Sequence, residues 1–129
     1  DWSIERRNEI AKRYDEAFGS GQYSVVSDQI SIPYREEGIV HAFHLYVIEV
    51  QPEKRRALYD YLRAHNIFAQ VLYIPAHTMP YYKSLGHKEG KCPVAEDYYT
   101  RCLALPMYPS LTDAEQEYVI ETIKEFFAQ

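Results

Sequence analysis

Hydrophobic positions recur at helical spacing in the first part of the chain and alternate in shorter runs further on, so the pattern predicts both helices and strands. Residues 3–18 place charged side chains between apolar residues that return every three or four positions, which predicts an amphipathic helix. We expect Gly19-Ser20-Gly21 to end this helix, because glycine tolerates the left-handed turn that ends helices. The residues expected to face inward are Ile10, Tyr14, Ala17 and Phe18.

Four segments are predicted to be strands, and the three longer ones are rich in the β-branched and aromatic residues that are typical of strands. Residues 41–50 are apolar on both faces, which predicts a strand in the centre of its sheet. The other predicted strands cover residues 23–32, 68–74 and 103–105.

Three further helices are predicted from the residues at which they start. Pro52 is expected to open a helix over residues 53–65, and Pro93 to open a shorter one, because proline suits the first helical turn. Thr112 and Glu115 have the spacing of a capping box and begin the last helix. In the helix over residues 53–65, the side chains expected to face the core are Leu58, Tyr61, Leu62 and His65, and Asn66 is expected to cap its C-terminal end. In the last helix, the side chains expected to face inward are Val119, Ile123, Phe126 and Phe127.

The predicted order of elements is helix, strand, strand, helix, strand, short helices, short strand, helix. Adjacent strands mixed with strand–helix–strand crossovers predict an α+β fold. We expect a small mixed or antiparallel sheet of three to four strands, with helices packed on one face. Neither an internal repeat nor a low-complexity tract marks a domain boundary.

The composition limits the kinds of partner. The 129 residues include 14 Lys+Arg and 19 Asp+Glu, for a formal net charge of −5. This mild acidity argues against nucleic acids and anionic membranes, because both bind clustered basic residues. No apolar run approaches a membrane span, no signal peptide opens the chain, and Cys92 and Cys102 lack a motif spacing. We therefore expect a reduced, cytoplasmic location.

Most candidate chemistry has a simpler structural explanation. His41 and His44 lie three apart on a predicted strand, so their side chains point to opposite faces, and we expect no metal site. The sequence has no serine-hydrolase elbow and no glycine-rich phosphate loop. Cys92 precedes Pro93 at a helix start that favours a reactive thiolate, but we favour its interpretation as a small packed side chain.

The segment Ile74–Tyr82 has the sequence IPAHTMPYY and is the best candidate for a ligand site. His77 follows a predicted strand and lies between Pro75 and Pro80, which restrict the backbone. A rigid loop at a strand end that presents histidine, threonine and tyrosine is a common site design. Composition alone leaves a second interpretation equally open, a turn with half-buried aromatic side chains.

A resemblance to a known family rests on the ordered series HAFHLYVIEV, LYDYLRAHNI, VLYIPAHTMPYY and CPVAEDYYTRCLALPMYPSLTDAEQEYVI. This series resembles the C-terminal part of the DegT/DnrJ/EryC1/StrS family, which are sugar aminotransferases dependent on pyridoxal phosphate. Upstream, ERRNEIAKRYDEAF looks like the long helix that joins their large and small domains. Within the family, the chain looks most like enzymes that aminate a 4-keto-6-deoxy nucleotide-sugar, such as the transaminase of the pseudaminic acid pathway.

The resemblance implies that residues 1–20 are an interdomain linking helix and residues 21–129 the small domain of a fold-type I aminotransferase. The large domain that binds pyridoxal 5'-phosphate would be missing from this chain, which begins without methionine. The lysine that binds the cofactor lies in that domain, so we expect no catalytic residue here and no binding of the cofactor by this chain alone. The lysines that do not match the family's lysine motif are Lys54, Lys83, Lys88, Lys91 and Lys124.

The resemblance also implies three substrate-binding residues. His77 matches a family histidine that reaches the active-site cleft, Tyr82 an aromatic residue that lines the sugar pocket, and His44 a residue of the H-L-Y strand that faces either the cleft or the core. The full-length protein is expected to be a homodimer that moves an amino group from glutamate to a keto-deoxy nucleotide-sugar in the synthesis of cell-surface polysaccharide or glycan precursors. The alternatives are a self-standing α+β ligand-binding or regulatory module, and a tyrosine-rich assembly surface without a ligand.

Overall fold

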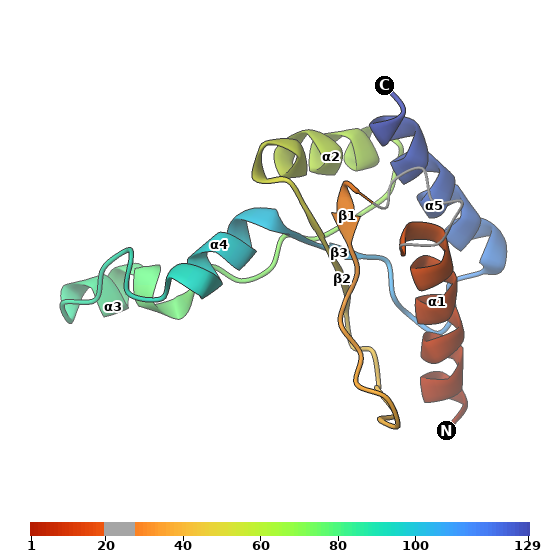
Figure 1. Ribbon diagram of the computed structural model, residues 1–129, viewed down its shortest axis with the longest axis horizontal. Helices are drawn as coiled ribbons and strands as arrows, with labels where there is room; N and C mark the ends of the chain where they lie inside the picture. The colour runs from red at the N-terminus through yellow and green to blue at the C-terminus, as the bar shows by residue number, and fades with distance from the viewer. Residues whose placement is uncertain (20–27) are drawn as a thin grey trace.

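The structure is a computed structural model that describes residues 1–19 and 28–129 (Figure 1). Its helices and strands follow one another in nearly the predicted order. Their bounds are α1 (Trp2–Phe18), β1 (Ile30–Ser31), β2 (Tyr46–Val50), α2 (Pro52–Ala64), the 3-10 turn η1 (Ala76–Thr78), α3 (Pro80–Ser84), α4 (Pro93–Arg101), β3 (Cys102–Leu105) and α5 (Asp113–Phe127).

The sheet has three antiparallel strands in the order β1-β2-β3 within the described part of the chain. The prediction of a central strand is confirmed, since β2 pairs on both sides. Tyr46 lies opposite Leu105 and Glu49 opposite Cys102, so β3 runs antiparallel along the first four residues of β2. The predicted α+β class is confirmed as well.

Two predicted strands are wrong in extent. The strand expected over residues 41–50 begins at Tyr46, because Phe43 has a φ of +43° and interrupts the extended backbone. The strand expected over residues 68–74 is reduced to one bridge, in which Gln70 and Ala104 exchange backbone hydrogen bonds of 2.9 and 2.8 Å.

The strand expected over residues 23–32 is represented by β1 alone. Residues 23–27 of that prediction lie outside the described residues.

Helix α1 is the predicted first helix, and its ends show how local chemistry sets its length. The Asp1 side chain accepts a hydrogen bond from the backbone N–H of Ser3 at the start. The helix ends at Phe18 as expected, but Gly19 has an extended backbone, with φ −67° and ψ 168°, and does not make the left-handed turn. Ser20 and Gly21 of that prediction lie outside the described residues. Glycine is needed there for space, since a Cβ on Gly19 would lie 2.5 Å from the backbone oxygen of Asp15.

The predicted caps of α2 and α5 are confirmed. Asn66 has a φ of +59°, and the N–H of Ile67 donates to the carbonyl of Leu62 at 2.9 Å, which is the hydrogen bond of a Schellman motif. At the start of α5, the side chains of Thr112 and Glu115 form the reciprocal capping box.

Three helices cover one face of the sheet. The buried residues of α1, α2 and α5 form a single core cluster with Tyr46, Ile48 and Val50 of β2 and with Leu103 and Leu105 of β3. Figure 1 shows these helices gathered on one side of the strands. The expectation of helices on one face is confirmed, and the predicted inward residues Ile10, Tyr14, Leu58, Leu62, Val119 and Ile123 are all buried.

The segment that contains η1, α3 and α4 extends away from the sheet (Figure 1), and we call residues 75–101 the arm. Helix α4 leads directly into β3. Arg101 fixes this junction, because its guanidinium forms ion pairs with Glu49 on β2 and Asp97 on α4. The arm is thereby held at the end of β3 that begins with Cys102.

The described residues contain neither a membrane-spanning helix nor a cluster of metal ligands. No described helix is long and apolar enough to cross a membrane. Likewise, the described histidine, cysteine and acidic side chains form no group of three that could hold a metal ion.

Candidate functional site

The segment Ile74–Tyr82 forms two short helical turns rather than an irregular loop. The carbonyl of Pro75 accepts hydrogen bonds from the backbone N–H and the hydroxyl of Thr78, at 2.9 and 2.8 Å, which closes η1. Pro80 then begins α3 at its first turn. The two prolines therefore define where each turn starts.

His77 lies in η1 and is held by a carboxylate from α4. Its Nε2 lies 2.7 Å from Oε1 of Glu96, and 11% of the His77 side chain remains exposed. Glu96 also accepts hydrogen bonds from the backbone N–H groups of Gly90 at 2.9 Å and Cys92 at 3.3 Å. One carboxylate thus joins η1, the loop after α3, and the first turn of α4.

The surroundings of Glu96 favour its charged form. The backbone N–H of Gly90, followed by the His77 ring, lowers the pKa of Glu96 below its ordinary value of 4.5. An ionised carboxylate only accepts hydrogen bonds. Nε2 of His77 therefore faces a group that can only accept a hydrogen bond.

Tyr82 lies on α3, further along the arm than His77. It is 40% exposed and meets Tyr81 and His87 edge to face, with ring centroids 5.4 and 6.0 Å apart. Nζ of Lys91 lies 2.6 Å from Nδ1 of His87, so the ammonium group donates to the ring. Tyr82 is therefore a half-exposed aromatic side chain beside a basic loop.

His44 lies away from the other two predicted substrate-binding residues. It is exposed and precedes Tyr46, which pairs with Leu105 at the far end of β3. The arm joins β3 at Cys102, at the other end of the same strand pair. His77 and Tyr82 therefore both lie on the arm, whereas His44 lies toward the opposite end of the β2–β3 strand pair.

Glu96 is the site residue that sequence reasoning missed. It lies 19 residues after His77 and belongs to the P-V-A-E series that supported the family resemblance. An acidic residue in the first turn of a helix is usually explained by its favourable interaction with the helix dipole. For this reason the sequence did not indicate that Glu96 contacts another segment. The packed interpretation of Cys92 is also wrong, since that side chain is exposed, whereas Cys102 is buried.

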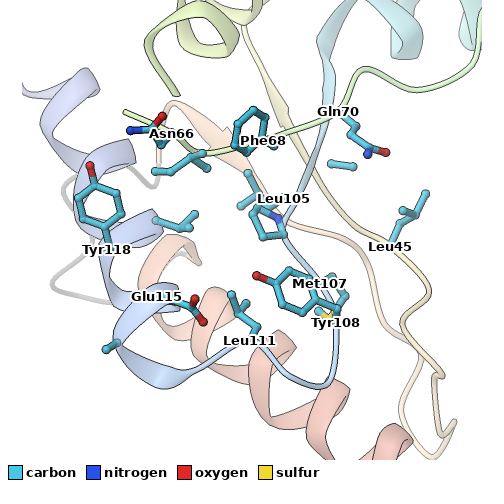
Figure 2. A pocket seen from close by; sticks show the side chains of 15 residues that line it. Leu45, Asn66, Phe68, Gln70, Leu105, Met107, Tyr108, Leu111, Glu115 and Tyr118 are labelled. Carbon is cyan, nitrogen blue, oxygen red and sulfur yellow. The ribbon is translucent and has the colours of Figure 1, made fainter. Parts of the chain in front are cut away.

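A separate hollow of about 650 Å³ lies between α5, the segment after β3 and the residues that follow α2. Figure 2 shows Phe68, Leu105 and Tyr118 on its walls. Its one acidic side chain, Glu115, is engaged in the capping box. The hollow is therefore mainly apolar, and the sequence analysis did not predict it.

The described residues do not fit a site for pyridoxal phosphate. The cofactor needs a lysine amine and donors for its phosphate, but no lysine lines the apolar hollow or two shallower hollows, one beside Arg101 and one beside Arg35. The arginines beside two of them, Arg35 and Arg101, are paired with acidic side chains. No step of cofactor chemistry is assigned to this chain.

Comparisons with known proteins identify the family. The model of the DegT/DnrJ/EryC1/StrS aminotransferase family matches residues 1–124. Among similar proteins, the pleiotropic regulatory protein of Geobacillus stearothermophilus is 36% identical over 98% of this chain and 32% of its own length. The spore coat polysaccharide biosynthesis protein SpsC of Bacillus subtilis is 38% identical over 93% of this chain and 31% of its own.

A named sugar aminotransferase and a solved structure agree with this match. The dTDP-4-dehydro-2,3,6-trideoxy-D-glucose 4-aminotransferase of Saccharopolyspora spinosa is 32% identical over 95% of this chain and 29% of its own. The crystal structure of a DegT DnrJ EryC1 StrS aminotransferase from Brucella abortus has a TM-score of 0.81, with 32% identity over 98% of this chain and 32% of that one. The chain spans about a third of the length of these relatives. From the match over residues 1–124 and the shared fold, we conclude that the chain belongs to the DegT/DnrJ/EryC1/StrS aminotransferase family.

Proposed function

We propose that this chain is the small domain of a nucleotide-sugar aminotransferase. In the full-length protein, an amino group would pass from glutamate to a keto-deoxy nucleotide-sugar during the synthesis of cell-surface polysaccharide or glycan precursors. The observation that carries the proposal is the family match over residues 1–124. Two relatives support the substrate class by name, since one is a dTDP-sugar 4-aminotransferase and the other a polysaccharide biosynthesis protein.

The division of labour in this proposal follows from the side chains present. Pyridoxal phosphate, when bound by another part of a longer chain, would supply the electron sink that amino transfer needs. This domain would supply a wall of the cleft, with His77 making polar contacts to the substrate and Tyr82 packing against the sugar. His44 is retained as a candidate for a different part of the cleft. Residues 1–20 would link the two domains, residues 21–129 would form the small one, and the enzyme would be a cytoplasmic homodimer.

The proposal is tested with the coding sequence upstream of Asp1. We expect it to encode a large α/β domain with the cofactor-binding lysine, so that the full-length protein develops a new absorbance band with pyridoxal phosphate. We expect the 129-residue chain to leave the spectrum of the cofactor unchanged and to aminate nothing. A full-length protein without that lysine would overturn the proposed activity.

The roles of the arm residues are tested in the full-length enzyme. Amination of a dTDP- or UDP-linked 4-keto-6-deoxy sugar, with glutamate as donor, is followed by mass spectrometry. We expect His77→Ala and Tyr82→Ala to lower kcat/KM for the sugar about tenfold or more, which corresponds to one lost polar or packing contact. Tyr34→Ala is the control, since Tyr34 is 90% exposed and lies outside the arm. An unchanged rate in both arm variants would favour a structural role for the arm.

A regulatory or ligand-binding module is the second candidate. The 36% identity to a pleiotropic regulatory protein and the apolar hollow of about 650 Å³ favour it. It predicts a natural gene that begins near Asp1 and a protein that binds a small molecule without pyridoxal phosphate. The upstream sequence and the absorbance experiment therefore distinguish the two candidates.

A further inference from the structure

Glu96 has no part in the proposed function, yet its carboxylate meets three hydrogen-bonding groups of the arm. Its carboxylate accepts hydrogen bonds from the backbone N–H groups of Gly90 and Cys92 and from Nε2 of His77. Gly90 has a φ of +83°, a conformation that glycine adopts without strain, and this turn directs its N–H toward the carboxylate. The backbone N–H groups of Gly90 and Cys92 thus hold the Glu96 carboxylate in place beside the His77 ring.

The contact determines which nitrogen of His77 remains available. A carboxylate only accepts, so Nε2 donates its proton to Glu96, and in the neutral ring Nδ1 then has no proton. Within residues 1–19 and 28–129, the structure shows no hydrogen bond to Nδ1 of His77. The neutral ring therefore offers a single acceptor.

We propose that Glu96 is a positioning residue that holds His77 in the tautomer with the proton on Nε2, so that Nδ1 accepts a hydrogen bond from a hydroxyl group of the sugar substrate. The contact with substrate rests on the proposed function, but the tautomer is a property of this chain. Glu96 acts through His77 and does not touch the substrate. Glu96 would thereby support the part of the cleft wall that His77 forms.

The tautomer is measured first, in the 129-residue chain. Long-range ¹H–¹⁵N NMR spectra distinguish the two neutral tautomers of each histidine ring by the shifts of the two nitrogens. We expect the signals of His77, identified by their loss in His77→Ala, to show the proton on Nε2. Finding the proton on Nδ1 in the unsubstituted chain would overturn the proposal, whatever the variants do.

The variant Glu96→Ala tests the cause. It removes Oε1, the oxygen that faces both Nε2 of His77 and the N–H of Cys92. Without that acceptor, we expect the proton of His77 to be shared between Nε2 and Nδ1. The matched control is Glu89→Ala, which removes one carboxylate from the same loop, where Glu89 is 75% exposed and pairs with Lys83 at 3.0 Å. The control keeps the original tautomer, whereas an unchanged tautomer in Glu96→Ala contradicts the proposal.

The kinetic test uses the full-length enzyme. We expect Glu96→Ala to lower kcat/KM for the sugar about tenfold and to leave the reaction with glutamate unchanged, since one hydrogen bond is worth roughly that factor. Because Glu96 acts through His77, the double variant should be no slower than His77→Ala. An additive loss, or a loss in both half-reactions, would mean that Glu96 only stabilises the arm. If His77→Ala reacts normally, the role proposed for His77 fails. If His77→Ala is slow and Glu96→Ala is not, the present inference fails alone.

Discussion

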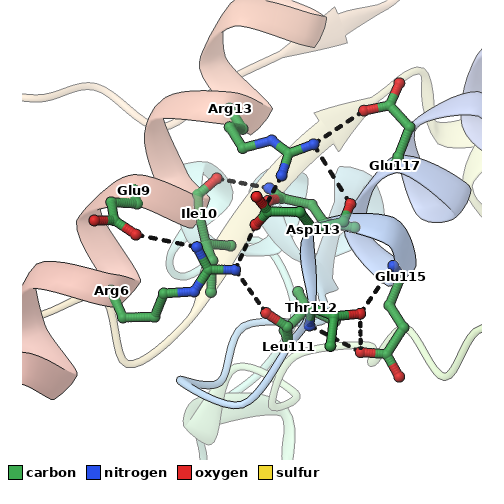
Figure 3. Close-up of polar contacts among 10 residues, drawn as sticks. Arg6, Glu9, Ile10, Arg13, Leu111, Thr112, Asp113, Glu115 and Glu117 are labelled. Carbon is green, nitrogen blue, oxygen red and sulfur yellow. Dashed lines mark hydrogen bonds and ion pairs between the residues drawn. The ribbon is translucent and has the colours of Figure 1, made fainter.

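Arg6 on α1 and Asp113 on α5 are 107 residues apart in the chain, and their side chains meet at 2.7 Å. The same Arg6 guanidinium donates to the backbone carbonyl of Leu111, also at 2.7 Å. Arg13 continues the contact two turns later, with ion pairs to Asp113 and Glu117 (Figure 3). Two arginines of the first helix therefore enclose the start of the last one.

Arg6→Ala should destabilise the fold although Arg6 lies outside the hydrophobic core. The exposed ion pair with Asp113 contributes little, because water and salt screen it. The hydrogen bond to the Leu111 carbonyl is more important, and the loss of such a bond from a charged donor costs about 1.5–3 kcal/mol. Urea denaturation measures the change. The control Lys12→Ala, on the exposed side of the same helix, should leave the midpoint within experimental error.

Two buried tyrosines should make the fold sensitive to alkali. Burial raises the pKa of both Tyr14 and Tyr46 well above the ordinary value of 10.0. Both are protonated in the folded and unfolded states below pH 10, where their contribution to stability is complete. Above pH 10 only the unfolded state loses these protons, so the free energy of unfolding falls.

The double variant Tyr14→Phe, Tyr46→Phe tests this effect. It loses the hydrogen bonds to the Pro106 carbonyl and to Asp15, which costs about 1 kcal/mol each at pH 8. Its stability should then decline less steeply between pH 9 and pH 11 than that of the unsubstituted chain. Parallel slopes in the two proteins would exclude these tyrosines as the cause.

Gly19→Ala should destabilise the carboxyl end of α1 through crowding. The added methyl group would lie 2.5 Å from the backbone oxygen of Asp15, so one of the two must move, and overpacking of this kind costs about 1–3 kcal/mol. Gly38→Ala is a useful comparison, since Gly38 has a φ of +82° but no atom near its added Cβ. Equal stability of Gly19→Ala and the unsubstituted chain in thermal denaturation would refute the crowding.

Thr112→Ala should cost about 1 kcal/mol, because it removes half of the capping box on α5. Thr112→Ser should restore most of the loss, and Thr100→Ala, at an exposed site inside α4, serves as the control. The hydrogen bonds from Thr112 lower the pKa of Glu115 below 4.5. The part of this advantage that depends on the ionised Glu115 carboxylate is therefore complete at neutral pH and falls as the pH falls through the lowered pKa, whereas the hydrogen bond from the Glu115 N–H to the Thr112 hydroxyl remains. Denaturation at pH 7 and pH 3 measures both effects.

The elements whose starts depend on residues close together in the sequence were predictable. Helix α4 begins at Pro93, and the capping box starts α5, because the interactions that start them span four residues or fewer. The two shortened strands were not predictable in this way. Phe43 takes a positive φ where Arg7 donates to its carbonyl at 2.8 Å and its own ring is buried, and both contacts come from the tertiary structure.

The candidate site shows the same limit. The sequence pointed to His77 through the two prolines around it, which act locally. It did not reveal Glu96 as the partner, because the two residues meet only when the loop between them folds back. The apolar hollow likewise joins segments from three parts of the chain, so no local pattern could indicate it.

The different environments of the two cysteines have a practical consequence. Cys102 is buried within β3, whereas Cys92 is exposed at the start of α4, four residues before Glu96. In this 129-residue chain, a maleimide dye should therefore attach at Cys92, beside the contact between Glu96 and His77. Its fluorescence anisotropy would follow the motion of that segment without an engineered labelling site.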